Sequence, residues 1–163
     1  MSFLTSLRRS FISGLAGAAI VPFFVPTEII AGYTGIDLRQ NTAVCNTSDG
    51  YLGHYNKHNN TITVCVDNYM EQGVARSTVV RHEVIHRVQC NIGTKEVLPK
   101  GLLRYIVAQT FNAEEVLEVV LQYPEEEHHG EYEARIFQQL PEGIVSGLLF
   151  YSNIYRNIRK SIT

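Results

Sequence analysis

The clearest pattern of apolar and polar positions lies in the middle of the chain. Apolar side chains recur there at helical spacing, at Val79, Val80, Val84, Ile85 and Val88. A face that repeats about every 3.6 residues is typical of a helix packed on a core. Neither glycine nor proline interrupts residues 74–92, and Gly93 follows them. The pattern predicts a helix over residues 74–91 that ends at Gly93.

The preceding stretch is rich in threonine, valine, tyrosine and asparagine. These residues indicate strands, which we predict over residues 42–45, 51–55 and 61–66. The last of these alternates as a half-buried strand does, and the polar stretch 56–60 predicts a hairpin loop before it. We therefore expect a short antiparallel sheet. Cys45 and Cys65 would lie on neighbouring strands, where a disulfide can form in an oxidising compartment.

Prolines divide the C-terminal half into helical segments. Asn112 and Glu115 are spaced as a capping box, which predicts a helix that ends before Pro124. Pro124 and Pro141 can each open a further helix. The predicted helices span residues 101–110, 112–123 and 124–140, and the last begins at 141. In the last helix we predict a core-facing stripe at Ile144, Leu148, Tyr151 and Tyr155. Strands followed by helices indicate an α+β fold.

The N-terminal segment differs from the rest of the chain. Arg8 and Arg9 precede an uncharged run, residues 10–27, that contains Pro22 and Pro26. The run resembles a bacterial export signal, and its paired arginines loosely resemble a twin-arginine signal. We favour an apolar arm over residues 1–34 that packs on the domain, a partner chain or a membrane. An exported, membrane-associated or assembled protein is favoured over a free cytoplasmic one.

Composition narrows the range of functions. The length of 163 residues suits one domain with a real core, predicted over residues 35–163. A net charge of -2 and a pI near 6.3 give no indication of a nucleic-acid partner. Three cysteines are too few for a disulfide scaffold, and their spacing is not that of a cysteine-based zinc site.

The strongest chemical motif lies on the predicted central helix. It reads His82-Glu83-Val84-Ile85-His86. Two histidines four residues apart share one face of a helix, so both imidazoles can bind the same metal ion. Glu83 lies next to that face, where its carboxylate can accept a proton from water. The spacing therefore predicts a metal site with His82 and His86 as ligands and Glu83 as a catalytic base.

This H-E-x-x-H motif resembles the zinc site of the zincin metallopeptidases. Val79, Val84, Ile85 and Val88 fit the extended zincin pattern, whereas Arg87 stands where an uncharged residue is usual. The segment from Glu131 to Arg135 resembles the E-x-x-x-D helix of the gluzincin subgroup. This resemblance implies a small zincin-like domain with Glu131 as the third zinc ligand. It places Arg135 at the position of the usual aspartate, so another oxygen would have to orient a histidine ring.

Other ligands remain open at the sequence level. Glu133 is the rival of Glu131, and residues two apart on a helix point to nearly opposite sides, so only one of them can bind. His128 and His129 are further candidates in the same segment. Both carboxylates can also belong to an acidic, solvated helix start.

The resemblance implies a zinc-dependent peptidase that hydrolyses peptide bonds through a zinc-activated water, with a peptide or protein as substrate. Residues 61–66 would then be an edge strand that pairs with extended substrate, or else an internal strand. Tyr123, Tyr132 and His129 are candidate oxyanion donors. The alternative is a non-catalytic structural or assembly protein that retains the fold, for example a virion component or a membrane-associated subunit.

Overall fold

The computed structural model describes residues 25–47, 50–94 and 96–162. The predicted N-terminal arm therefore lies outside the described residues, except for positions 25–34. Within the described part, no helix is both long and apolar enough to span a membrane.

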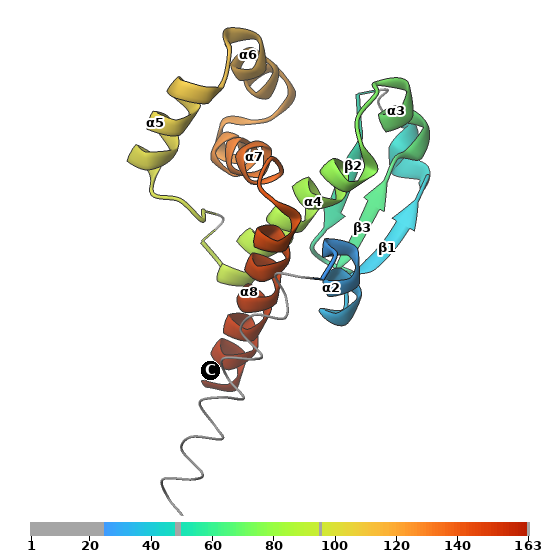
Figure 1. Ribbon diagram of the computed structural model, residues 1–163, viewed down its shortest axis with the longest axis vertical. Coiled ribbons are helices and arrows are strands. Elements are labelled where there is room, and N and C mark those ends of the chain that lie inside the picture. The colour runs from blue at the N-terminus through green and yellow to red at the C-terminus, as the bar shows by residue number, and fades with distance from the viewer. Residues whose placement is uncertain (1–24, 48–49, 95, 163) are drawn as a thin grey trace, which may run out of the picture.

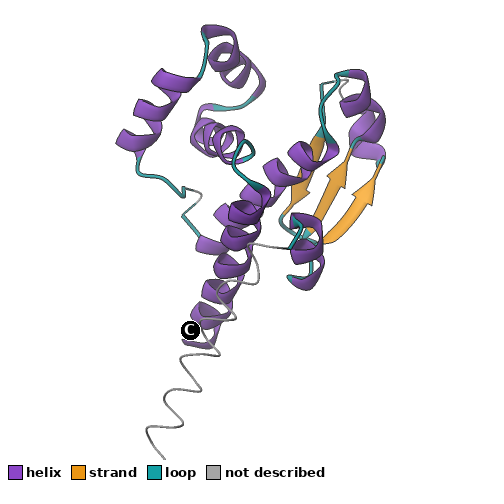
Figure 2. Ribbon diagram, viewed as in Figure 1, coloured by secondary structure: helices purple, strands orange, loops and turns teal. Residues whose placement is uncertain are grey.

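The described chain is a mixed α+β fold that is mostly helical (Figures 1 and 2). The strands are β1 (Asp37–Gln40), β2 (Gly53–Asn56) and β3 (Thr61–Val64). The helices are α2 (Thr27–Tyr33), α3 (Val66–Glu71), α4 (Arg76–Ile92), α5 (Lys100–Thr110), α6 (Ala113–Gln122), α7 (Glu125–Phe137) and α8 (Glu142–Ile162). One 3-10 helix, η2 (Ala43–Asn46), precedes β2.

The sheet is mixed, with strand order β1-β3-β2. Strand β2 pairs with β3 in antiparallel fashion, as the hairpin prediction requires. Strand β1 pairs with β3 in parallel, with Leu38 opposite Ile62, so the prediction of a purely antiparallel sheet is wrong. All four residues of β3 are buried between the two neighbours. Of the two alternatives that the sequence left open for residues 61–66, the structure therefore selects the internal strand and excludes the substrate-binding edge.

In the N-terminal half of the domain one predicted strand is wrong and one observed strand was not predicted. Residues 43–46 form η2 rather than a strand, and β1 was not predicted. Only Leu38 of β1 is partly buried, so the strand has none of the apolar alternation by which strands are recognised. Cys45 and Cys65 do form a disulfide, which joins η2 to the residue that precedes α3.

Helix α4 forms the centre of the molecule. Its apolar face contributes Val80, Val84 and Ile85 to the core, all at most 1% exposed. The helix packs on β2 and β3 on one side and on α7 and α8 on the other (Figure 1). It ends at Gly93, whose φ of 76° is left-handed and favours glycine, as the sequence predicts.

The C-terminal helices agree with their predicted positions. Helix α6 has the predicted capping box, in which Asn112 accepts from the Glu115 amide and the Glu115 carboxylate accepts from the Asn112 amide. In α8 the predicted core stripe is wrong at three positions, because Ile144, Tyr151 and Tyr155 are exposed, whereas its fourth residue, Leu148, packs against the core. Helix α8 instead buries its Val145, Ser146, Leu149 and Ser152 face. That face packs on α4 and on α2.

Candidate metal centre

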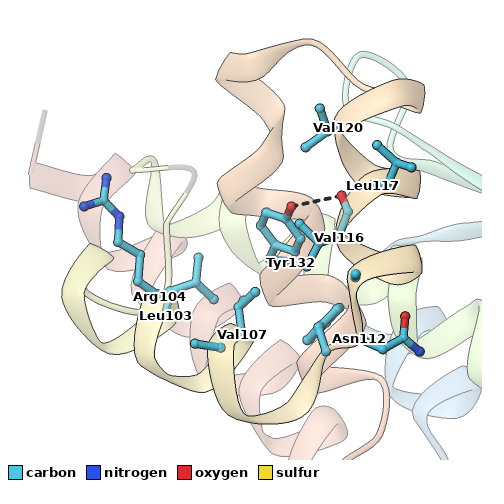
Figure 3. Close-up of a pocket in the computed structure, with 11 residues that line it drawn as sticks. Leu103, Arg104, Val107, Asn112, Val116, Leu117, Val120 and Tyr132 are labelled. Atoms are coloured by element: carbon cyan, nitrogen blue, oxygen red, sulfur yellow. Dashed lines mark hydrogen bonds between the residues drawn. The ribbon is translucent and has the colours of Figure 1, made fainter.

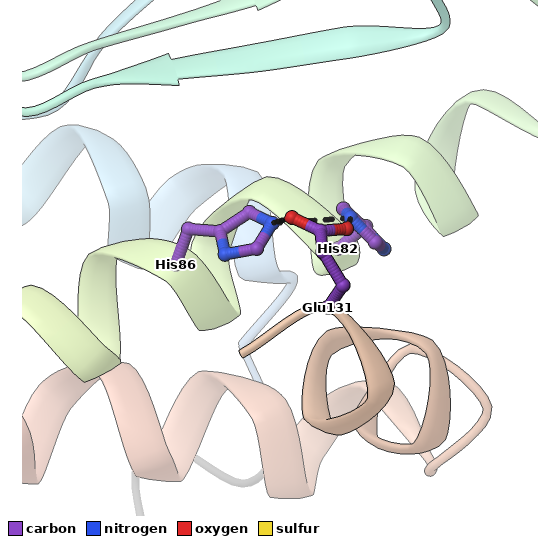
Figure 4. A group of neighbouring side chains, drawn as sticks. All are labelled: His82, His86 and Glu131. Carbon is purple, nitrogen blue, oxygen red and sulfur yellow. Dashed lines mark hydrogen bonds and ion pairs between the residues drawn. The ribbon is translucent and has the colours of Figure 1, made fainter. Parts of the chain in front are cut away.

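Three potential metal ligands meet between α4 and α7. His82 and His86 lie one turn apart on α4, and Glu131 points toward both from α7 (Figure 4). The Nε2 atoms of the two histidines are 3.1 Å apart. Glu131 Oε1 lies 3.2 Å from His86 Nε2, and Oε2 lies 3.4 Å from His82 Nε2. The structure therefore brings together the histidine pair and the first of the two predicted carboxylates.

These separations suit a small tetrahedral ion. Two ligand atoms bonded to zinc at about 2.0–2.1 Å with tetrahedral angles are themselves about 3.3 Å apart. The observed distances of 3.1, 3.2 and 3.4 Å are close to that value. Glu131 Oε2 is also buried and accepts no hydrogen bond from the described residues. A buried oxygen with a free lone pair toward two imidazoles fits a bound cation.

Both histidine rings are oriented by glutamine side chains. The Nδ1 atom of His82 lies 3.0 Å from Gln138 Oε1, and that of His86 lies 3.0 Å from Gln89 Oε1. Since an amide oxygen can only accept, each Nδ1 carries a proton, so each ring, when neutral, would present the lone pair of its Nε2 to the centre. The amide oxygens thus supply the orientation that the gluzincin pattern assigns to an aspartate.

Glu133 lies outside the candidate centre and holds other groups. Its carboxylate, on a residue with 0% exposure, accepts hydrogen bonds from the amides of Val97 and Leu98 and from Gln89 Nε2 at 2.9 Å. His129 donates to it at 3.0 Å. Its oxygens are therefore occupied within the fold, and Glu131 is the carboxylate that faces the histidines.

Burial and neighbouring charges shift the pKa values of His86 and Glu131. Burial by itself lowers the pKa of His86, but its hydrogen bond to Glu131 and the charges of Glu83 and Glu131 outweigh burial and raise the pKa to about 9. Burial raises the pKa of Glu131, but its interactions with the neighbouring His82 and His86 imidazoles outweigh burial and hold the pKa below its usual range. Without a metal, His86 and Glu131 therefore form an ion pair near neutral pH.

Glu83 lies beside the centre, against the edge strand β2. The residue is 5% exposed, and no described residue donates a hydrogen bond to its carboxylate. A side chain added to Gly53 would stand 2.8 Å from Glu83 Oε1 and 2.7 Å from Val79 Cγ1. Glycine at this position of β2 therefore lets the strand approach α4 closely, and the Glu83 carboxylate occupies the space that a side chain would fill.

Two tyrosines lie within electrostatic range of the centre. Burial, followed by the charge of Glu131, raises the pKa of the Tyr123 hydroxyl. Burial and then the charges of Glu83 and Glu131 raise the pKa of Tyr51. Tyr132, also considered as an oxyanion donor, instead donates to the carbonyl of Val116 at 3.3 Å. Of the three donors considered from the sequence, Tyr123 is the one whose pKa is raised by the charge of the candidate ligand Glu131.

The neighbouring histidines of α7 are directed elsewhere. His128 donates to the carbonyl of Tyr123 at 2.8 Å, and His129 donates to Leu98 and to Glu133. Neither belongs to the group of residues whose ligand atoms lie within 4.8 Å of one another.

The two arginines that depart from the family pattern both have structural contacts. Arg87 is 2% exposed and donates to the Tyr55 hydroxyl on β2 at 3.2 Å, so it points toward the sheet. Arg135 forms an ion pair of 2.8 Å with Glu118 on α6. Neither side chain is paired with His82 or His86.

An apolar groove of about 490 Å³ lies on the side of α7 that faces α5 and α6 (Figure 3). Leu103, Val107, Val116 and Tyr132 are among its lining residues. None of His82, His86, Glu83 and Glu131 lines it. The groove and the candidate metal centre are therefore separate features.

Sequence reasoning did not identify Gln89, Gln138, Gly53 or Tyr51. Gln89 stands three residues after His86, which places the two on one helix face and was an available signal. The others depend on contacts between distant segments.

Comparison of the chain with models of protein families, with curated proteins and with solved structures finds no match. Its function is therefore inferred from its own residues.

Proposed function

We propose that this protein is a zinc-dependent metallopeptidase with a small, zincin-like site. The observation that carries the proposal is the convergence of His82, His86 and Glu131 at separations of 3.1–3.4 Å. Two imidazoles and one carboxylate are the ligand set of several zinc peptidases, and three protein ligands leave a fourth position for water. When bound, zinc would supply Lewis acidity and a more acidic water.

The surrounding residues suit hydrolysis. Among the described residues no donor forms a hydrogen bond to the Glu83 carboxylate, so it can accept a proton from water and return it to the leaving nitrogen. The Gln89 and Gln138 oxygens hold the imidazoles with their lone pairs toward the centre. Tyr123 and Tyr51 are candidate donors to a developing oxyanion.

An extended peptide is the substrate class that the surroundings favour. Strand β2 is the edge of the sheet, and no described strand lies beyond it. A side chain added to its residue Gly53 would overlap Glu83, so the strand passes close to this carboxylate. A peptide that adds to this edge as a further strand would bring a backbone amide next to the Glu83 carboxylate.

Metal content tests the site. Purified protein dialysed against zinc should retain about one ion per chain, and Glu131→Ala should retain almost none. Glu127→Ala is the matched control, because Glu127 is an exposed carboxylate one turn earlier on α7. Equal zinc retention by the Glu131→Ala and Glu127→Ala variants would exclude Glu131 as a ligand.

Turnover tests the chemistry. Zinc-loaded protein should cleave peptides in a denatured peptide pool, and Glu83→Gln should lower the rate at least ~100-fold with zinc content unchanged. Cleavage at the same rate by the Glu83→Gln variant would remove the peptidase proposal.

A second candidate function is a structural or assembly role without turnover. It is favoured by exposed apolar side chains that suit contacts with other molecules, including Leu121 at 75% and Ile162 at 79% exposure. Zinc bound tightly with no cleavage of any peptide by the unmodified protein would select this alternative.

A further inference from the structure

The C-terminal half of α8 leaves the body of the molecule. The first half packs on α4 and α2, whereas the second half projects beyond them (Figure 1). Ser152 is the last buried residue of α8. Beyond it, Ile154, Tyr155, Ile158 and Ile162 are 40%, 51%, 54% and 79% exposed.

These apolar residues belong to one continuous face. Ile144, Leu148, Tyr151, Tyr155, Ile158 and Ile162 follow one another at alternating intervals of four and three positions, and we refer to them as the α8 stripe. Residues with this spacing share one side of a helix. The buried face of α8, which contains Val145 and Leu149, is a different face. Leu148 of the stripe packs against the core, whereas Tyr155, Ile158 and Ile162 are more than half exposed. The part of the stripe on the projecting segment is therefore an apolar surface that the described part of the chain leaves largely open.

The charges of this segment all have one sign. After Glu142 the chain contains no acidic residue, and its charged residues are Arg156, Arg159 and Lys160. The whole chain has a net charge of -2, whereas this segment is positively charged. Arg159 lies against Gly93 at the end of α4. Arg156 and Lys160 lie on the polar side of the projecting segment.

We propose that the α8 stripe docks onto an anionic lipid surface, with the helix axis lying in the plane of the interface. An apolar face beside cations, without acidic residues, is the pattern of interfacial amphipathic helices. Tyr155 on the projecting part of the stripe suits the headgroup region, where the apolar ring meets the lipid and the hydroxyl meets water. The cations are complementary to the negative charge of the lipid.

A second copy of the chain is a poorer occupant of this face. Two stripes packed together would leave the cations of each segment without an acidic partner, because neither segment contains an acidic residue. The stripe is also shorter than the three to four heptads from which coiled coils are usually recognised. This inference is independent of the proposed peptidase activity.

Vesicle binding of the full chain is the experiment. The protein is sedimented with vesicles of phosphatidylcholine alone and with vesicles that contain about 30% phosphatidylserine. We expect binding to the anionic vesicles, weaker binding to the neutral ones, and a decrease as salt is raised.

Two double variants test the two properties of the segment separately. Ile158→Ser with Ile162→Ser should weaken binding to anionic vesicles by about 100-fold or more, because two apolar side chains that would be buried in the lipid are lost. Arg156→Gln with Lys160→Gln should weaken it by roughly 25-fold, at about fivefold per cation. Leu117→Ser with Leu121→Ser is the matched control, since these α6 leucines are also 53% and 75% exposed.

The outcomes separate the proposal from its rivals. Loss of vesicle binding in the two α8 variants, with the α6 control unchanged, supports it. Unchanged binding by the Ile158→Ser, Ile162→Ser variant would overturn it and direct attention to the apolar N-terminal run, residues 10–27. An absence of vesicle binding by the unmodified chain, or a dimer that these same substitutions dissociate in the ultracentrifuge, would also overturn it.

Discussion

Gln89 on α4 donates a hydrogen bond of 2.9 Å to the buried carboxylate of Glu133 on α7. It also donates to the Gly130 carbonyl at 3.0 Å, so both N–H groups of its side-chain amide have acceptors on α7. The amide oxygen is thereby directed to His86 Nδ1. Glu133, which lies outside the candidate centre, thus orients the candidate ligand His86 through one intervening side chain.

Glu133→Gln should therefore weaken zinc binding by about 10–100-fold, because the Gln89 amide loses its anchor. Gln89→Leu should have a similar effect while leaving the Val97 and Leu98 amides bonded to Glu133. If both act through His86, the double variant should lose less affinity than the two single losses multiplied together. Competition with a chromogenic chelator measures the affinities, and multiplicative losses would show that Glu133 and Gln89 act independently.

Gly53→Ala should lower peptidase turnover about tenfold or more and leave zinc content unchanged. The new methyl group would overlap Val79 and Glu83, so β2 or the Glu83 carboxylate must move. None of the candidate ligands His82, His86 and Glu131 is among the atoms nearest to it. Gly32→Ala is the control, since nothing lies within 4 Å of a side chain added there. Turnover and zinc content are measured on the same samples, and normal turnover by Gly53→Ala would argue against a catalytic position for Glu83.

Proton release should accompany zinc binding. The pKa of His86 is about 9 in the metal-free centre, and zinc needs the neutral ring, so binding at about pH 7.5 should release roughly one proton. Calorimetry in two buffers with different ionisation enthalpies measures this number. In Glu131→Ala the ion pair is absent, and we expect any residual binding to release less.

The same shift affects the stability of the metal-free protein. Because the folded pKa of His86 lies above its ordinary value of 6.5, the stabilisation is complete below about pH 6.5 and is lost as pH rises through 9. The melting temperature of the metal-free protein should therefore fall between about pH 6.5 and pH 9.5. Glu131→Ala should reduce that decrease, and an equal decrease in both proteins would contradict the assignment.

Reduction of the Cys45–Cys65 disulfide should destabilise the fold by about 3 kcal/mol, because the bond closes a loop with a sequence separation of 20. Denaturant unfolding with and without a phosphine reductant measures the change. The Cys45→Ser, Cys65→Ser variant should match the reduced protein and should not respond to reductant. Stability that is insensitive to reductant in the unmodified protein would indicate that the bond does not constrain the unfolded chain.

The central helix and the C-terminal helices could be predicted because their signals are local. Apolar periodicity, Gly93, and the Asn112–Glu115 capping box each act within one or two turns. Glu131 and the histidine pair were recognisable as a motif, although the contact itself depends on how α7 packs on α4. Strand β1 could not be predicted, since its four residues become a strand only through pairing with β3.

The stripe on α8 shows a different limit of sequence reasoning. Helical spacing identified Ile144, Tyr151 and Tyr155 as one face, and that is correct. It did not reveal that the buried side of the helix is the neighbouring face, which contains Val145 and Leu149. Periodicity indicates which side chains lie together, whereas burial depends on the surfaces of α2 and α4 that meet them. The glutamines beside the histidines were missed for a similar reason, because amide side chains have no distinctive spacing.

The position of α7 between α4 and the outer helices has a consequence for how the molecule opens. Helices α5 and α6 pack mainly on α7, and α7 packs on α4 across the histidine–carboxylate centre. An ion held by both helices would act as a cross-link, and its binding free energy would oppose the separation of α7 from α4. Amide hydrogens across residues 100–137 should then exchange as one cooperative unit, more slowly with zinc than with a chelator.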